Sequence, residues 1–236
     1  MKKLVVANWK LNPKTEKEAV RLALAEDKLN VVIAPPFPFL SAVGKVLKRA
    51  KLGAQDAFYE AEGAFTGAVS PSMLRSLGVR YVIVGHSERR ADGESDATVA
   101  KKVSAAERAG LAVILCVGEP WSVRKKGITA AKQFVKMQLS ADLKKVRSPL
   151  IVAYEPIWAI GSGKADKPEE AAEMAQFIKS FLVKRSKLKV RVLYGGSVSP
   201  KNAESFFKGK GIDGALVGGS SLSLKQFREI VASAKV

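Results

Sequence analysis

A short segment near the middle of the chain, residues 153–164, carries the residues best suited to acid–base chemistry. It reads AYEPIWAIGSGK and contains one carboxylate, Glu155, that is followed by a proline and a glycine-rich stretch. Pro156 keeps Glu155 out of helical geometry, and Trp158 gives the next loop an apolar anchor. The segment therefore predicts a catalytic base with its own lid, although a lone Glu-Pro pair is more often a solvated connection. The predicted lid comprises Trp158, Ala159, Ile160, Gly161, Ser162, Gly163, Lys164 and Ala165.

Two further groups that could take part in such chemistry follow other apolar runs. Asn8 and Lys10 come directly after the first run, where the lysine can place a positive charge against an anionic substrate. His86, the only histidine, precedes Ser87 and Glu88 at a predicted helix start. Helix N-terminal amides would keep its imidazole neutral, so that it can donate a hydrogen bond to a carbonyl oxygen. Taken singly, such a lysine is usually only solvated and such a histidine is more often structural.

Two glycine-rich turns near the end of the chain could bind a phosphate. One is Gly195-Gly196-Ser197 and the other is Gly218-Gly219-Ser220, and each follows a late apolar run. Glycine amides can approach a phosphate closely because no Cβ intervenes. A single Gly-Gly pair is usually only a turn, but two pairs after consecutive late strands, with the Gly161 flap, indicate a phosphate site.

The elements that must position these residues alternate regularly along the chain. Eight short apolar runs, each predicted to be a strand, are Leu4 to Ala7, Val31 to Ala34, Leu52 to Gln55, Tyr81 to Val84, Ala112 to Val117, Leu150 to Ala153, Val190 to Tyr194 and Ala215 to Val217. Segments with helical periodicity lie between most of them, one capped by Thr15 and another opened by Pro168. Eight such repeats predict an α/β fold, a (β/α)8 TIM barrel that forms a single domain over residues 1–236.

Composition limits the classes of protein to which the chain can belong. One cysteine and one histidine exclude an internal disulfide and disfavour a structural zinc site, and no metal is expected. Cys116 is interpreted as a small packed residue. The sequence shows no membrane span and no secretory signal, which predicts a cytoplasmic protein.

The chain is strongly basic, with 40 Lys and Arg against 22 Asp and Glu and a formal net charge of +18. Such a charge attracts polyanions, so nucleic acid has to be considered as a partner. The basic residues fall largely in predicted helices and loops and lack interleaved aromatic residues, which favours solvated helical faces. No nucleic-acid partner is therefore expected, and the same field would attract a small dianionic substrate.

Seven segments, in order between residues 7 and 222, resemble those of the triosephosphate isomerase family. They are ANWKLN, GAFTGAVSP, VGHSERR, CVGE, AYEPIWAIGSGKA, YGGSVSPKN and DGALVGGSSL. The resemblance implies a (β/α)8 barrel that interconverts dihydroxyacetone phosphate and glyceraldehyde 3-phosphate in glycolysis and gluconeogenesis. It also implies that the enzyme needs no cofactor and forms a homodimer.

The resemblance also assigns site residues by their positions in these motifs. Glu155 matches the family's general base, His86 the neutral electrophile and Lys10 the cation beside it, with Asn8 at the site and Glu88 in a supporting position. The residues that match the phosphate-binding backbone are Gly161, Ser197, Gly218 and Gly219. Closure of the lid is expected to exclude water and to protect the enediolate.

The same resemblance places the dimer contact in the loop that holds Phe65, Thr66 and Gly67. The chain departs from the family at Ala68, where an acidic residue is usual, and this bears on the strength of the dimer. Three alternatives remain: another phosphosugar-binding barrel enzyme, a basic nucleic-acid-binding protein on a barrel scaffold, and a barrel with an inactive site. The combination of Lys10, His86 and Glu155 argues against the first and the third, and the second predicts duplex binding that depends steeply on salt.

Overall fold

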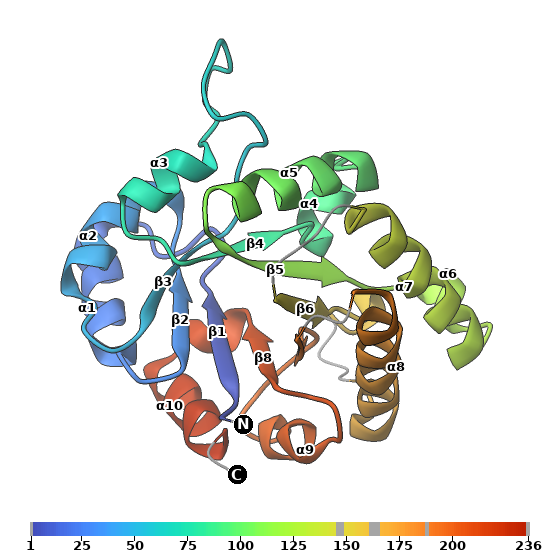
Figure 1. The fold of residues 1–236 in the computed structure, drawn as a ribbon. Coiled ribbons are helices and arrows are strands. Elements are labelled where there is room, and N and C mark those ends of the chain that lie inside the picture. The colour runs from blue at the N-terminus through green and yellow to red at the C-terminus, as the bar shows by residue number, and fades with distance from the viewer. Residues whose placement is uncertain (1, 145–148, 161–165, 187–188, 235–236) are drawn as a thin grey trace.

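Parallel strands close on themselves to form a barrel in the computed structural model, which describes residues 2–144, 149–160, 166–186 and 189–234. Each strand pairs with the next, and β8 pairs with β1, so that no strand edge is left open (Figure 1). The strands are β1 (Leu4–Asn8), β2 (Val31–Ala34), β3 (Lys51–Ala54), β4 (Tyr81–Val84), β5 (Ala112–Val117), β6 (Leu150–Tyr154), β7 (Val190–Tyr194) and β8 (Gly214–Val217). The predicted (β/α)8 TIM barrel is confirmed.

Helices surround the barrel and cover its outer face (Figure 1). The α-helices are α1 (Glu16–Glu26), α2 (Leu40–Val46), α3 (Pro71–Ser76), α4 (Ser87–Ala91), α5 (Asp96–Arg108), α6 (Trp121–Arg124), α7 (Ile128–Asp142), α8 (Pro168–Ser186), α9 (Ala203–Lys208) and α10 (Leu224–Ser233). The 3-10 helices are η1 (Phe37–Phe39), η2 (Ile157–Ala159) and η3 (Gly219–Leu222). Among the described helices, none has both the length and the apolar character needed to cross a membrane.

Alternate side chains of the strands belong to two separate apolar layers. Val6 and Ile114 are buried inside the barrel, whereas Val5 and Ala7 pack outward against the helices. This alternation follows from the two-residue period of a strand, and because both faces are covered, the strands are apolar throughout. Cys116 belongs to the inner layer and is fully buried, as the sequence predicts for a packed residue.

Helix starts follow the predicted capping signals. The Thr15 side chain accepts a hydrogen bond from the Glu18 N–H at 3.3 Å, and α1 begins at the next residue, Glu16. Pro168 is the first residue of α8, where its missing N–H costs nothing. Met174 and Ile178 on this helix are buried against the barrel.

The third strand lies one residue earlier than the sequence predicts. It spans Lys51–Ala54, so Gln55 lies just beyond its end. The Gln55 Nε2 donates to the main-chain oxygens of Lys10 and Ala34, both at 2.9 Å. Gln55 therefore supports the backbone at the end of β2 and just beyond the end of β1.

A buried pair of side chains connects the first strand to the first helix. Trp9 follows β1, and its Nε1 donates to Glu26 Oε2 at 3.1 Å. Glu26 lies at the end of α1 and is only 1% exposed. Burial raises the pKa of Glu26 from 4.5 to about 8, although the Trp9 hydrogen bond opposes this shift. The carboxyl group is therefore protonated in the folded protein at neutral pH.

Replacing Glu26 with glutamine is expected to stabilise the protein at alkaline pH. The folded protein retains a proton on Glu26 that the unfolded chain releases, so stability falls as pH rises from 4.5 to about 8. Glutamine can still accept from Trp9 but has no proton to lose. The variant and the parent should unfold alike near pH 4.5 and differ by roughly 2–4 kcal/mol above pH 8. Urea unfolding at both pH values measures the difference, and equal differences at the two values would contradict the prediction.

Candidate active site

Glu155 lies immediately after β6, at the carboxyl end of the barrel strands, and is 1% exposed. Its backbone N–H donates to the Val117 oxygen at 2.8 Å, which continues the pairing with β5 by one residue. Its Oε2 accepts from the Ser87 N–H at 2.9 Å, and its Oε1 lies 3.2 Å from His86 Nε2. The carboxylate is therefore held beside the imidazole that follows β4, two strands away in the barrel.

His86 is the N-cap residue of α4 and is 6% exposed. Its Nδ1 accepts a hydrogen bond from the Glu88 N–H at 3.2 Å. A nitrogen that accepts carries no proton, so this geometry belongs to the neutral tautomer with hydrogen on Nε2. His86 thus lies at a helix start, where the sequence predicts it.

Arg90 holds the backbone between the end of β4 and His86. Its Nε donates to the Gly85 oxygen at 2.8 Å, and its Nη2 donates to the Cys116 oxygen at 3.2 Å. The same nitrogen contacts Asp142 Oδ2 at 2.7 Å. Sequence analysis assigned Arg90 no function, because its partners are main-chain oxygens and two carboxylates, Asp96 on α5 and Asp142 on α7.

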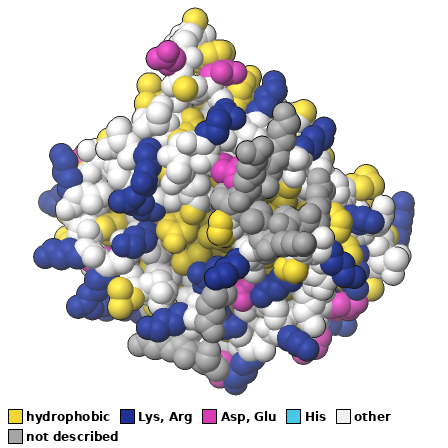
Figure 2. All heavy atoms as spheres, in the orientation of Figure 1, with side chains coloured by type: hydrophobic (Ala, Val, Ile, Leu, Met, Phe, Trp, Pro, Cys, Tyr) yellow, Lys and Arg dark blue, Asp and Glu magenta, His cyan; other side chains and the backbone are white. Residues whose placement is uncertain are grey.

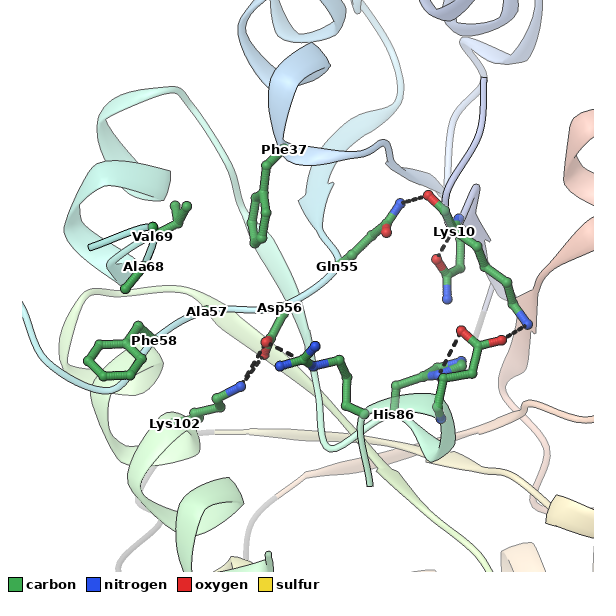
Figure 3. Close-up of a pocket in the computed structure, with 14 residues that line it drawn as sticks. Lys10, Phe37, Gln55, Asp56, Ala57, Phe58, Ala68, Val69, His86 and Lys102 are labelled. Carbon is green, nitrogen blue, oxygen red and sulfur yellow. Dashed lines mark hydrogen bonds and ion pairs between the residues drawn. The ribbon is translucent and has the colours of Figure 1, made fainter. Parts of the chain in front are cut away.

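Lys10 has a backbone conformation that is rare for a residue with a side chain. Its φ is +53°, in the left-handed region, and the conformation is supported by a hydrogen bond from its N–H to Asn8 Oδ1 at 3.1 Å. Gln55 binds its carbonyl oxygen (Figure 3). Its Nζ lies 2.6 Å from Glu88 Oε1. The structure therefore brings Asn8, Lys10 and Glu88 together, and Gln55 is an additional support that sequence analysis missed.

A polar hollow of about 320 Å³ lies next to these residues. Its lining includes the side chains of Asn8, Lys10 and His86. It also includes Ser197, Gly218 and Gly219, which belong to the two late glycine-rich turns. A Cβ at Gly218 would lie 3.2 Å from the Lys10 Cε, so glycine leaves room for the lysine there. Asn202 holds the Ser197 turn, because its Nδ2 donates to the Ser197 oxygen at 3.0 Å. The predicted phosphate-binding turns therefore face the same space as Lys10 and His86.

The space beside the Glu155 carboxylate depends on Gly195, in the turn that follows β7. A Cβ at Gly195 would lie only 2.8 Å from the Glu155 Cγ. Gly195 also donates its N–H to the Tyr154 oxygen at 2.8 Å, which holds its backbone against β6. Any larger residue at this position would displace the Glu155 side chain.

The start of the predicted lid is tied to the barrel through Glu119. Trp158 Nε1 and the Tyr154 hydroxyl both donate to Glu119 Oε1, at 3.1 and 3.0 Å. Burial raises the pKa of Glu119, against the effect of these two donors and of Arg124. The Arg124 guanidinium lies over the Trp158 ring, 5.4 Å from its centroid.

The residues that follow the lid are tied to the same arginine. Arg124 Nη2 lies 3.5 Å from Asp166 Oδ1, and the Tyr194 hydroxyl accepts from the Asp166 N–H at 3.1 Å. Burial raises the pKa of Asp166 to about 6, and Arg124 opposes this shift. Among the lid residues, the structure describes Trp158, Ala159 and Ile160. Gly161, Ser162, Gly163, Lys164 and Ala165 lie outside the described residues.

The lid contacts were only partly accessible from the sequence. Glu119 belongs to the CVGE segment, but nothing in that segment shows which side chains it accepts from. Arg124 lies in a short helix, and its contacts with Trp158 and Asp166 connect residues 34 and 42 positions apart. Ser197 adds a direct contact, because its hydroxyl donates to the Ala159 oxygen at 2.5 Å.

The site contains the groups that proton transfer next to a carbonyl requires. A carboxylate can take the proton, an imidazole N–H can donate to the oxygen that gains charge, and an ammonium group can stabilise that charge. All of them lie at the carboxyl ends of the strands, beside a hollow with exposed backbone amides. This fold and this arrangement define a (β/α)8-barrel enzyme.

Comparisons with known proteins identify the family. A family model described as triosephosphate isomerase matches residues 3–234. The triosephosphate isomerase of Carboxydothermus hydrogenoformans is 45% identical, over 98% of this chain and 98% of its own length. Those of Thermus thermophilus and Aquifex aeolicus are 45% and 42% identical, over 95% and 99% of this chain and 95% and 100% of their own lengths. The chain belongs to the triosephosphate isomerase family.

Proposed function

We propose that this chain interconverts dihydroxyacetone phosphate and D-glyceraldehyde 3-phosphate by proton transfer through an enediolate. The observation that carries the proposal is the 3.2 Å approach of Glu155 Oε1 to His86 Nε2 beside the hollow that Lys10 and the late glycine turns line. The match of nearly the whole chain to the isomerase family supports it. It also favours the isomerase over another phosphosugar enzyme, a nucleic-acid-binding barrel or an inactive barrel.

The proposed reaction assigns one step to each group. Glu155 removes a proton from the carbon next to the substrate carbonyl, and the electron pair moves onto the carbonyl oxygen. The Nε2–H of His86 donates to that oxygen, and the charge of Lys10 stabilises the enediolate. The proton of the neighbouring hydroxyl moves to the oxygen that gained charge, relayed by His86 Nε2, and Glu155 returns its own proton to the neighbouring carbon, which completes the exchange of the carbonyl and hydroxyl positions. Neither oxidant nor reductant is consumed.

The carboxylate has to turn before it can act on a substrate in the hollow. In the structure it is buried and bound to the Ser87 N–H. A Cβ at Gly195 would lie 2.8 Å from the Glu155 Cγ, so the glycine leaves room for the side chain beside the loop that follows β7. The Ser87 contact is thus the resting position of the base in the proposed mechanism.

The phosphate of the substrate is proposed to bind at the other end of the hollow, against the backbone amides of Ser197, Gly218 and Gly219. A Cβ added at Gly219 would have no other atom within 4 Å, so this backbone is open to a ligand. Gly161 would complete the phosphate site from the lid, and lid closure would exclude water from the enediolate.

Activity is tested by converting glyceraldehyde 3-phosphate in an assay coupled to reduction of dihydroxyacetone phosphate. We expect turnover that is inhibited by a phosphate-bearing analogue of the enediolate. Folded protein without turnover at any enzyme concentration would contradict the proposed function. We also propose a cytoplasmic location, which membership of the triosephosphate isomerase family supports.

We also propose a homodimer formed through the loop between β3 and α3. This loop projects away from the body of the barrel beside α3 (Figure 1). Phe65 on the loop is 43% exposed and packs on Phe58, with ring centroids 4.8 Å apart. An exposed aromatic side chain on a projecting loop is typical of an interface.

The surface that would receive the partner's loop lies beside the catalytic lysine. A hollow of about 400 Å³ is lined by Lys10, Glu88, Gln55 and Phe37, among others (Figure 3). Phe37 is 38% exposed and gives the hollow an apolar wall. A loop inserted here would contact the groups that hold Lys10, which explains how dimerisation could support activity. Ala68 removes the acidic residue that is usual in the family, so the dimer is expected to be weaker than most.

Replacing Phe65 with glutamate is expected to dissociate the dimer and lower activity at low enzyme concentration. A carboxylate would have to be desolvated in the interface, which should raise the dimer dissociation constant by roughly 100-fold or more. Sedimentation and activity over a dilution series measure both effects. Met137→Glu is a matched control, because Met137 is 58% exposed on α7, away from the loop. Identical behaviour of the Phe65 variant and the parent would contradict the proposed interface.

No nucleic-acid partner is proposed, despite the charge. On the face drawn in Figure 2, Lys and Arg side chains lie in separate places from one side of the outline to the other. Several basic side chains of the chain form ion pairs, such as Lys132 with Glu173 and Lys179 with Asp213, both at 2.6 Å. A charge spread in this way resembles solvated helical faces more than a groove for a nucleic-acid backbone.

A further inference from the structure

A second hollow lies at the opposite end of the barrel from the candidate active site. It occupies about 740 Å³ where α1 and α10 meet the residues that precede β1 and β2. Its apolar lining includes Val5, Phe227 and Val231, and the exposed Leu29 extends this apolar surface outward. Its basic lining residues are Lys2, Lys3, Lys28, Arg49 and Arg228. Its volume falls in the range typical of small-molecule sites, about 300–1,000 Å³.

Part of the positive charge around this hollow has no paired carboxylate among the described residues. Asp27, the carboxylate next to Lys28 in sequence, accepts from the backbone N–H groups of residues 48–50 at 2.6–3.0 Å. Within the described part of the chain, no carboxylate forms an ion pair with Lys28 or Arg228. Two of the rim cations are already engaged, because Lys3 Nζ donates to the Ile212 oxygen at 2.6 Å and Arg49 interacts with the charge of Asp27. Among the described residues, Lys28 and Arg228 are therefore the basic side chains best placed to pair with an anion.

Glu26 also lines the hollow, and it adds a hydrogen-bonding group without adding negative charge. One carboxyl oxygen, Oε2, accepts from Trp9, whereas Oε1 is buried and has no partner among the described residues. Burial raises the pKa of Glu26 to about 8, so the group is protonated at neutral pH and can donate through its O–H. A buried polar atom without a partner is uncommon in folded proteins, so Oε1 is a hydrogen-bonding position that a group bound in the hollow could use.

We propose that this hollow binds a small amphipathic anion, with its carboxylate or phosphate head among the basic rim residues and its hydrocarbon body on the Val5, Phe227 and Val231 surface. The basic side chains favour a negatively charged head group, and the apolar lining residues favour a hydrocarbon body. The site is separate from the isomerase site, since the two hollows share no lining residue. It does not depend on the proposed activity.

Binding can be followed at the Trp9 indole, which contacts Glu26 directly. The probes are octanoate and octyl phosphate, with 1-octanol as the uncharged counterpart, each kept below the concentration at which it forms aggregates. The measurement is the ¹H–¹⁵N signal of the Trp9 indole in the full chain, assigned with a Trp9→Phe variant. We expect a saturable shift with one or both anions, and the two anions distinguish a carboxylate site from a phosphate site. Octanol should bind at least about tenfold more weakly, because it lacks the charge.

A charge-removal variant tests the assignment of the rim. Lys28→Ala/Arg228→Ala should raise the dissociation constant of the bound anion about tenfold or more. Lys126→Ala/Lys184→Ala removes the same charge from exposed positions on other elements and should leave binding unchanged. The proposal is wrong if neither anion moves the Trp9 signal, if octanol binds as tightly as the anions, or if both double variants behave alike. Circular dichroism of each variant establishes that the barrel is folded.

Discussion

Replacing Glu155 with glutamine lowers kcat by about 10³-fold, the range expected for loss of a general base, while the barrel stays folded. The amide has nearly the shape of the carboxylate, and its oxygen can still accept the Ser87 N–H that Glu155 Oε2 accepts at 2.9 Å. It cannot take a proton from carbon at neutral pH. KM should change little, because the phosphate turns and Lys10 remain in place.

A shorter carboxylate provides a graded test of the same assignment. Glu155→Asp keeps the base but withdraws it by one methylene, and kcat should fall by orders of magnitude, about 10²-fold or more. Glu169→Gln is a matched control, since Glu169 is an exposed glutamate in the first turn of α8. Steady-state kinetics in both directions measure the effect. Turnover of either Glu155 variant within a few-fold of the parent would mean that another group is the base.

The barrel could be predicted because its signals are local and repeated. Apolar runs at even intervals mark the strands, and capping residues such as Thr15 and Pro168 mark helix starts at the residues where they occur. The weakest prediction was β3, which was placed one residue late. It contains Gly53 and begins with an exposed lysine, so the pattern there barely distinguishes strand from loop.

The candidate site could be predicted only in part. Parallel strands end at one edge, so residues that follow different runs, such as Lys10, His86 and Glu155, were expected to meet. The groups that hold them could not be found in this way. Gln55, Arg90 and Glu119 act through main-chain atoms or buried partners far away in the sequence. Such contacts depend on tertiary packing, for which periodicity and spacing carry no signal.

The burial of Glu26 is a second feature that could not be predicted from the sequence. At the end of α1 its position suggests an ordinary solvated glutamate, because nothing in the local sequence indicates that Trp9 reaches it. The structure makes it both a pH-sensitive group in the fold and part of the hollow at the far end of the barrel. Its properties follow from burial alone, which only the packed structure reveals.

Replacing Lys10 with alanine is expected to raise KM and to lower kcat as well. The ammonium group is proposed to attract the anionic substrate and to stabilise the enediolate, so it contributes in both the ground state and the transition state. Loss of one charged donor should weaken binding about 10-fold or more and lower kcat by roughly 10²-fold. Its removal also leaves Glu88, which lies 2.6 Å from the Lys10 Nζ, without its counter-charge.

A double variant separates these two consequences of losing Lys10. In Lys10→Ala/Glu88→Ala the bare carboxylate is gone, so its repulsion of the substrate is removed and KM should recover by a few-fold. The kcat should stay low, because no cation has been restored beside the enediolate. Lys14→Ala is the matched control, since Lys14 is an exposed lysine in the same loop. If Lys10→Ala left both KM and kcat at the parent's values, Lys10 would have no part in the site. If the double variant instead recovered kcat, the effect of Lys10 would be only to neutralise Glu88.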